Sequence, residues 1–193
     1  MSRISIALAV SSLVITLTGD ILLDRGVRHA IDKQGIDQLF SVDIDSVLQA
    51  SDLVVGNLEC PATQIKAPVF KQYIFRAEPE WLSDLKRHGI THLNLANNHS
   101  IDQGREGLMD TYQNIQKTGI VPFGAGRNMQ EAIQPVLLSN SPRRVWLVAS
   151  LQLALENYAH LPDHPCVSQQ SIDALCRQIA QLRKDDQIGR AHV

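Results

Sequence analysis

The sequence has few of the features that assign a chain to a specialised class. Its 193 residues contain only three cysteines, Cys60, Cys166 and Cys176, and no two of them form a C-x-x-C pair. Paired-cysteine metal motifs are therefore excluded, and the odd number argues against a disulfide framework. The formal net charge is only -2. The charge thus gives no reason to expect nucleic acid or an anionic membrane surface as a partner.

Long hydrophobic runs are also missing. Beyond the N-terminal region, no segment approaches the roughly 20 apolar residues of a membrane-spanning helix. At the N-terminus, one arginine precedes the apolar run Ile4 to Val10, as in a signal peptide, but no clear small-residue cleavage site follows. Residues 1–12 are therefore expected to be a leader, which is either a signal or anchor segment, an additional strand or a disordered segment. Membrane association would involve only this part of the chain.

What the sequence does contain is the pattern of an α/β protein. Hydrophobic residues make up 44% and charged residues 20% of the chain, which suits one domain with a sizeable core. The periodicity predicts strands and helices in alternation, then a hairpin and a last helix. The predicted strands are 13–18, 53–56, 91–96 and 120–123, the hairpin is 136–138 with 145–149, and the helices are 27–33, 42–50, 78–88, 104–117, 129–133 and 172–182.

Three of the predicted strands end in groups that can bind a cation. Asp20 follows the first strand, Glu59 the second, and Asn98 with His99 the third. Because sites in open α/β sheets form outside the carboxyl ends of the strands, we expect these side chains to converge. Carboxylate, amide and imidazole groups are all metal ligands, and Asp102 could orient the imidazole. The sequence therefore predicts a metal site at this edge.

Two basic regions near the predicted site have two interpretations each. Arg25 could neutralise a bound anion or form a surface ion pair in its loop. The loop 63–77 carries Lys66, Lys71 and Arg76, and a solvated basic loop is the preferred interpretation over an anion contact. The same loop contains a short extended piece at 73–75.

Other polar or flexible residues are interpreted as structural. Gly124-Ala125-Gly126 lacks the third glycine of a dinucleotide fingerprint and the Gly-Lys-Ser/Thr of a P-loop, so a plain turn is favoured over a nucleotide site. His88 lies in the last turn of a predicted helix and His92 within a strand, and both are expected to be structural.

Three motifs in this chain resemble the CapA family of bacterial capsule and poly-γ-glutamate biosynthesis proteins. They are Gly19-Asp20, Gly56-Asn57-Leu58-Glu59 and the Asn-Asn-His-Ser-Ile-Asp-x-Gly run at 97–104. The last is the specific one. The resemblance extends from about residue 13 to about residue 151, and it includes the turn at 124–126. The CapA family lies within the calcineurin-like metallophosphoesterase superfamily.

The resemblance implies the N-terminal part of a four-layer α/β/β/α sandwich with two divalent metal ions. Asp20 would bind the first metal, Glu59 would occupy the bridging position and Asn98 would bind the second. His99 would act as an acid or electrostatic stabiliser, with Asp102 beside it. Such ligands suit Mn, Fe, Zn or Mg.

The implied function is a metal-dependent hydrolase of the cell envelope that acts on a phosphoester or an envelope polymer. Its partners would be that substrate and other capsule-synthesis proteins, and no nucleic acid. The alternative is a non-catalytic scaffold subunit of a polymer synthesis or export complex. The residues themselves leave a cytoplasmic location open.

The chain also departs from the family pattern at its end. The resemblance implies further histidine ligands in a second half, and His160 and His164 do not match those motifs. Residues 188–193 read like the translation of a sequencing adapter. We therefore expect residues 13–187 to be an incomplete metallophosphoesterase-like domain, inactive alone and weak in metal binding.

Overall fold

The computed structural model describes residues 12–140 and 143–185. The predictions for the leader at 1–11 and for the tail at 186–193 lie outside the described residues. In chain order the elements are β1 Ile15–Ile21, α1 Gly26–Gln34, η1 Ile36–Leu39, α2 Val42–Ala50, β2 Leu53–Leu58, α3 Trp81–Arg87, β3 His92–Asn94, α4 Gly104–Lys117, β4 Val121–Phe123, β5 Ala125–Gly126, α5 Met129–Ala132, β6 Val136–Ser139, β7 Val145–Leu147, β8 Cys166–Val167 and α6 Ile172–Asp185.

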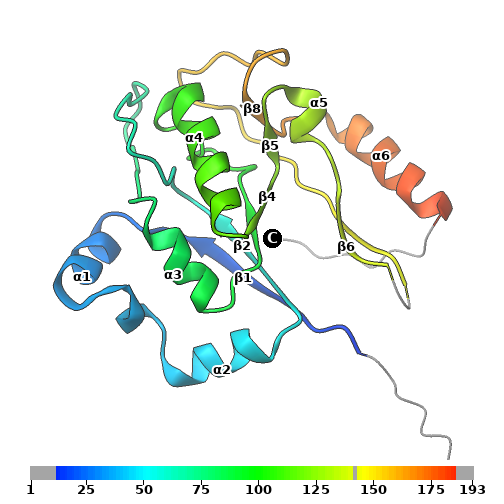
Figure 1. Ribbon diagram of the computed structural model, residues 1–193. Coiled ribbons are helices and arrows are strands. Elements are labelled where there is room, and N and C mark those ends of the chain that lie inside the picture. The colour runs from blue at the N-terminus through cyan, green and yellow to red at the C-terminus, as the bar shows by residue number, and fades with distance from the viewer. Residues whose placement is uncertain (1–11, 141–142, 186–193) are drawn as a thin grey trace, which may run out of the picture.

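The centre of the fold is a four-stranded parallel sheet in the order β1-β2-β3-β4. Strands in sequence order with right-handed crossovers carry their connecting helices on a single face. Figure 1 shows this arrangement, with α1 to α4 on one side of the sheet and the β6–β7 hairpin and α6 on the other. The predicted α/β class is confirmed, and the arrangement is consistent with the N-terminal part of a metallophosphoesterase-like sandwich.

The core lies between the sheet and its helices. The strand residues Val54 and Leu93 pack there with Leu82 of α3 and Leu108 and Ile115 of α4, and all five have no exposed surface. Burial of one such side chain stabilises the fold by about 1.5–3 kcal/mol. Hydrophobic burial therefore fixes the sheet against α3 and α4, and it fixes where the strands end.

The opposite face of the sheet is only partly covered. In register across it lie Leu17 and Val55, and one step further lie Asn57, Asn94 and Phe123. Leu17 keeps 37% of its surface exposed, whereas Val54 on the helical face is fully buried. The segment after β7 and one side of α6 face this surface across a cavity, and the strand residues open into it.

A bulge in β1 decides which way Asp20 points. Leu17 pairs with Val55 but Asp20 pairs with Asn57, so β1 uses three residues where β2 uses two. Gly19 absorbs the extra residue with a φ of 74°, a conformation that glycine adopts without steric cost. Without the bulge, Asp20 would face the helices. The bulge turns its carboxylate to the same face as Leu17 and Asn57.

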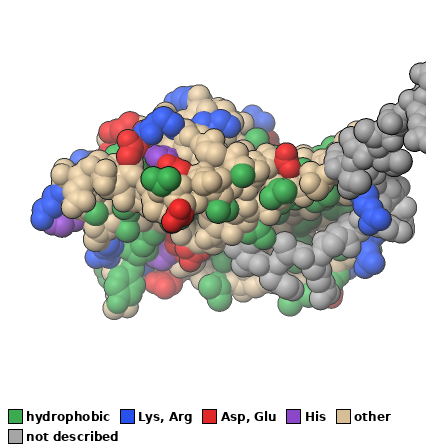
Figure 2. Space-filling view, turned by 90° about the horizontal axis from the view of Figure 1, so that it is seen from below, with side chains coloured by type: hydrophobic (Ala, Val, Ile, Leu, Met, Phe, Trp, Pro, Cys, Tyr) green, Lys and Arg blue, Asp and Glu red, His purple; other side chains and the backbone are tan. Residues whose placement is uncertain are grey.

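The structure also corrects several predicted elements. The 3-10 helix η1 and the short strand pair β5–β8 were not predicted. Of the three residues on the predicted apolar face of α2, only Leu48 is buried. Ile44 and Val47 are 48% and 58% exposed. Figure 2 views the molecule from below, and hydrophobic side chains stand among charged ones on that face.

The residues that were interpreted as structural are buried or paired. His88 lies between Asp37 and Asp45, with its nitrogens 3.0 and 2.6 Å from their carboxylates, and its ring stacks on Phe40. His92 is buried, and burial lowers its pKa. The three cysteines are free. No helix among the described residues is long and apolar enough to span a membrane.

Candidate metal-binding site

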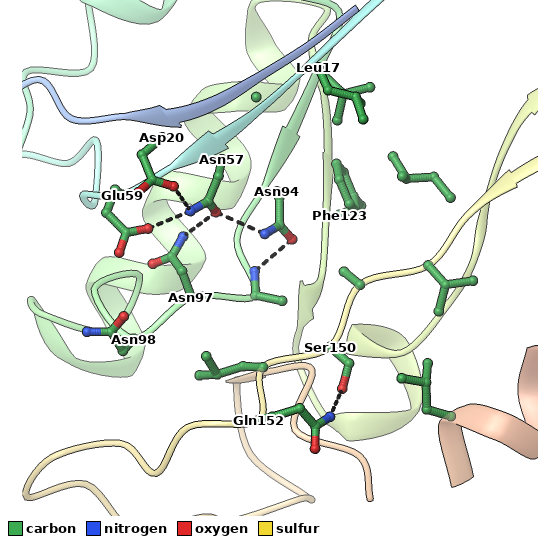
Figure 3. Close-up of a pocket in the computed structure, with 18 of the residues that line it drawn as sticks. Leu17, Asp20, Asn57, Glu59, Asn94, Asn97, Asn98, Phe123, Ser150 and Gln152 are labelled. Carbon is green, nitrogen blue, oxygen red and sulfur yellow. Dashed lines mark hydrogen bonds between the residues drawn. The ribbon is translucent and has the colours of Figure 1, made fainter. Parts of the chain in front are cut away.

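The predicted cation ligands line one end of a cavity of about 630 Å³ on the open face of the sheet. Asp20, Glu59 and Asn98 all border it, as Figure 3 shows. The carboxyl ends of β1, β2 and β3 therefore bring together side chains that are far apart in the sequence. The rest of the wall is mainly apolar and includes Leu17 and Phe123. His99 follows Asn98 but does not border this cavity.

The side-chain amide of Asn57 connects the two carboxylates. Its Nδ2 donates to Asp20 Oδ1 at 2.8 Å and to Glu59 Oε2 at 2.6 Å. Its Oδ1 accepts from the Nδ2 atoms of Asn94 and Asn97 at 2.9 and 3.0 Å. All donors and acceptors of Asn57 are therefore used (Figure 3). One oxygen of each carboxylate remains available to a cation.

Asn97 shapes the turn that carries Asn98 and His99. It is buried, and its Nδ2 also donates to the Leu58 carbonyl oxygen at 2.9 Å. Its Oδ1 accepts from the backbone amides of His99 and Ser100 at 3.0 and 2.8 Å. Asn97 thus ties the turn to the end of β2. Asn97 was part of the motif but was not predicted as a site residue. It fixes the position of the turn that carries Asn98 and His99.

The two carboxylates lie close enough to repel each other. Burial and the neighbouring Asp20 carboxylate raise the pKa of Glu59, while the Asn57 hydrogen bond acts in the opposite direction. Glu59 is partly buried and Asp20 is exposed. A cation placed between them would relieve this repulsion, because it would attract both carboxylates.

His99 is oriented by the carboxylate that the sequence assigned to it. His99 Nδ1 lies 2.9 Å from Asp102 Oδ2, and the imidazole packs on the Phe75 ring with centroids 4.3 Å apart. The Asp102 side chain is fully buried. Its Oδ2 also accepts from the Phe75 backbone amide at 2.7 Å. The imidazole is therefore fixed by a hydrogen bond on its edge and by an aromatic ring on its face.

The interpretation of the basic loop as solvated is wrong for two of its three cations. The Lys71 side chain is only 4% exposed and lies 2.6 Å from Asp102 Oδ1. Arg76 binds Glu78 through two nitrogens, at 2.6 and 3.1 Å, and its side chain is 18% exposed. Only Lys66 is exposed as expected. The loop is folded onto the turn of the specific motif, which buries Lys71 and largely covers Arg76.

Arg25 does not form the surface ion pair that was one of its two interpretations. Asp24 pairs instead with Arg28, at 3.2 Å. The Arg25 guanidinium lies over the rings of Tyr73 and Phe75, with its central carbon 5.8 and 5.2 Å from their centroids. Within the described residues no carboxylate pairs with it. Its φ of 57° is unusual for a residue with a side chain. Arg25 is thus a cation near the candidate site that has no acidic partner in the part of the chain that the structure describes.

The Gly-Ala-Gly turn has a packing role. A Cβ atom on Gly124 would lie 2.7 Å from Asn94 Oδ1, and one on Gly126 would lie 2.5 Å from the Glu131 side chain. Both glycines therefore permit close approach of the chain to its neighbours. The following helix, α5, is only four residues long. These contacts give the glycines a packing role, and Ala125 and Gly126 form the strand β5 rather than the plain turn that was predicted.

The donor atoms at the edge are of the type that a hard cation binds, but they are too few to complete its coordination. Asp20, Glu59 and Asn98 supply two carboxylates and one amide, which are groups that Mg²⁺ and Mn²⁺ accept. Within residues 12–140 and 143–185, however, no three His, Cys, Asp or Glu side chains lie close enough to form a metal cluster. The described residues thus fit part of a metal site, and further ligands would have to complete it.

Besides Asn97, the sequence reasoning missed three residues that organise this site, Asn57, Asn94 and Lys71. Asn57 and Asn94 are paired in register on neighbouring strands, a signal that becomes visible only when the strand alignment is known. Lys71 lies 28 residues from His99 and carries no local pattern that would link it to the motif. Its burial depends on how the loop folds.

Comparisons with known proteins agree with the motifs. The family model described as "Bacterial capsule synthesis protein PGA_cap" matches residues 14–188. The chain is 28% identical over 183 residues to the capsule biosynthesis protein CapA of Bacillus anthracis, which covers 93% of this chain and 44% of that protein. It is 33% identical over 119 residues to the PGA biosynthesis protein CapA of Bacillus subtilis, or 61% of this chain and 31% of that protein.

The chain thus spans less than half the length of either relative. The match of the family model nevertheless covers nearly all of the described residues, including the three motifs at the sheet edge. The predicted resemblance to the CapA family is confirmed: this chain belongs to the bacterial capsule synthesis protein family PGA_cap.

Proposed function

We propose that this domain is the metal-binding part of a metal-dependent hydrolase that acts on a phosphoester or an envelope polymer. The observation that carries the proposal is the pair of carboxylates, Asp20 and Glu59, held side by side by Asn57 at the carboxyl edge of the sheet. Two acidic groups in this arrangement repel each other unless a cation is present. Asn98 borders the same cavity and would add an amide oxygen.

The resemblance suggests two divalent ions of Mn, Fe, Zn or Mg. A bound ion would polarise a phosphoryl or carbonyl oxygen and lower the pKa of a bound water. The protein itself would hold the metal ligands and position His99, the residue after Asn98. The His99 ring is fixed by Asp102 and Phe75. Arg25, which has no acidic partner within the described residues, is available to a substrate anion. The curated relatives are named for capsule and PGA biosynthesis, which supports an envelope polymer as the substrate and an envelope location.

The first experiment measures binding of Mn²⁺ to the 193-residue chain by calorimetry. We expect weak binding, with a Kd on the order of 10⁻⁴ to 10⁻³ M, because few charged ligands are present. Asp20→Asn and Glu59→Gln should each abolish it. The matched controls Asp163→Asn and Glu156→Gln change exposed acids outside the site and should bind as the unmodified chain does. Binding that survives both site substitutions would refute the assignment of these ligands.

The absence of a three-ligand cluster within the described residues favours a second candidate function, a non-catalytic scaffold subunit of a polymer synthesis or export complex. The two functions differ in what the site must do. Asp20→Asn or His99→Ala in the whole protein should stop polymer production if the site is catalytic. Production at the unmodified level, with the protein present in normal amounts, would favour the scaffold.

A further inference from the structure

We infer that Arg25 forms a separate subsite beside His99, which binds an oxyanion of the substrate, a phosphate or a carboxylate, away from the bond that reacts. The inference rests on the proposed function and deepens it, since it adds that the substrate carries a negative charge outside the cation site. Neither the family match nor the curated relatives assign a role to this arginine. Three features carry the inference: the donors of the side chain, the aromatic rings it packs on and its backbone conformation.

The guanidinium of Arg25 has donors that the described residues leave without an acceptor. A guanidinium offers five N–H groups in a planar fork. The adjacent carboxylate, Asp24, is already used. Its Oδ1 accepts from the Arg25 backbone amide at 2.7 Å and from Arg28 Nε at 3.2 Å, and its Oδ2 accepts from the Arg76 amide at 2.9 Å. Within the part of the chain that the structure describes, the Arg25 side chain makes no hydrogen bond or ion pair. Its fork is therefore available to a ligand with two oxygens.

The position of the guanidinium is fixed by aromatic rings. Its central carbon lies 5.8 Å from the Tyr73 ring centroid and 5.2 Å from that of Phe75, which are cation–π distances. The loop that carries the rings is itself fastened, because the Phe75 amide donates to Asp102 Oδ2 at 2.7 Å. The side chain of Arg25 therefore has little rotational freedom left to lose when an anion binds, and this favours binding.

The backbone conformation of Arg25 also points to a function. Its φ of 57° and ψ of -128° lie in a region that glycine adopts easily and that other residues rarely occupy. An exposed arginine without an acidic partner is common on protein surfaces and would carry no inference by itself. Here, however, an unfavourable conformation places the cation on two rings, and no hydrogen bond or ion pair of the side chain within the described residues offsets it. A contact with a ligand would account for it.

Phe75 connects this subsite with the candidate site. Its ring packs on the Arg25 guanidinium and also on the His99 imidazole, whose centroid lies 4.3 Å from its own. The subsite is therefore separated from His99 by one aromatic ring. Tyr73 is 55% exposed, so the subsite is open to a large ligand. It would favour a substrate with more than one negative group, such as a polymer with repeated phosphates or carboxylates, over a neutral one.

The test is an NMR titration of the 193-residue chain with sodium phosphate or sodium glutarate, at constant ionic strength and with a chelator present. The side-chain N–H signal of Arg25 and the ring signals of Tyr73 should shift and reach saturation. Arg25→Met should abolish the shift at Tyr73, and Arg25→Lys should weaken binding, because an ammonium lacks the planar fork. Saturation by either probe supports the subsite, and the tighter probe identifies the oxyanion. The absence of a saturable shift with both probes would overturn the inference.

Two further variants complete the test. Arg127→Met is the matched control, because the Arg127 side chain is 77% exposed but pairs with Glu131 at 2.7 Å. It should bind both probes as the unmodified chain does. Arg25→Gly covers the case in which Arg25→Met does not fold, since glycine accepts the backbone conformation at this position. Weaker binding in Arg127→Met, or full binding in Arg25→Gly, would contradict the inference. Because the chelator removes metal, failure here is distinct from failure of the metal-binding test.

Discussion

Glu59 and Glu78 are the same residue type in opposite electrostatic surroundings. At the sheet edge, burial and the Asp20 carboxylate raise the pKa of Glu59. In the ion-pair cluster beside the helices, hydrogen bonds from Arg76 and Arg28 lower the pKa of Glu78 to about 2. The cluster contains its own counter-ions, whereas among the described residues no lysine or arginine pairs with the two carboxylates at the edge. Charge that is balanced within the chain indicates a structural role, and charge left unbalanced indicates a site for a cation.

The cluster around Glu78 is also a tie between distant segments. Arg28 of α1 bonds to Glu78 at 2.8 Å and to the Arg76 carbonyl oxygen. The Arg76 backbone amide donates to Asp24 at 2.9 Å. These contacts fasten the start of α1 to the end of the loop that carries Lys71. The structural cluster therefore supports the loop from which the candidate site takes its buried lysine.

The largest expected effect on stability comes from the balanced cluster. Glu78→Gln removes the charge that Arg28 and Arg76 share, and it should lower the free energy of unfolding by about 2 kcal/mol, as for other charged hydrogen bonds. Urea unfolding measures this, with Glu80→Gln as the control because Glu80 is exposed two residues away. Equal stability of the two variants would contradict the structural role of the cluster.

The next effect is a pH dependence whose sign differs between the two glutamates. Glu78 has a folded pKa of about 2 against an ordinary value of 4.5, so its stabilisation is present above pH 4.5 and is lost as the pH falls toward 2. Thermal unfolding from pH 6 to 2 should show this loss, and Glu78→Gln should reduce it. If the variant lost as much thermal stability between pH 6 and pH 2 as the unmodified chain, other carboxylates would cause the loss.

The smallest effect is expected at the sheet edge. The pKa of Glu59 is raised, so its protonation stabilises the fold at low pH, and this stabilisation is lost as the pH rises through the folded pKa. At neutral pH without metal, Glu59→Gln should therefore stabilise the fold, by roughly 0.5 kcal/mol, because it removes repulsion with Asp20. Urea unfolding with a chelator present is the measurement. A clear destabilisation would mean that the two carboxylates are not in conflict.

Much of the fold could be predicted from the sequence because its helices are locally encoded. The helix 104–117 was predicted with both ends correct, since Gly104 and Gly119 bracket a clear apolar stripe. The helix 42–50 was also located correctly. The strand pair β5–β8 and the helix η1 were missed, because two-residue strands and single turns carry no periodicity of their own.

The sequence by itself determined which side chains lie at the strand ends. The change from an apolar run to a polar residue such as Asp20, Glu59 or Asn98 marks the end of each strand. Only the tertiary structure decided that Asp20 faces its partners, through the bulge at Gly19, and that Asn57 joins the two carboxylates. Only the tertiary structure buried Lys71 against Asp102. The reason is physical: strand ends follow from local hydrophobicity, whereas strand register and loop packing depend on contacts between segments far apart in the chain.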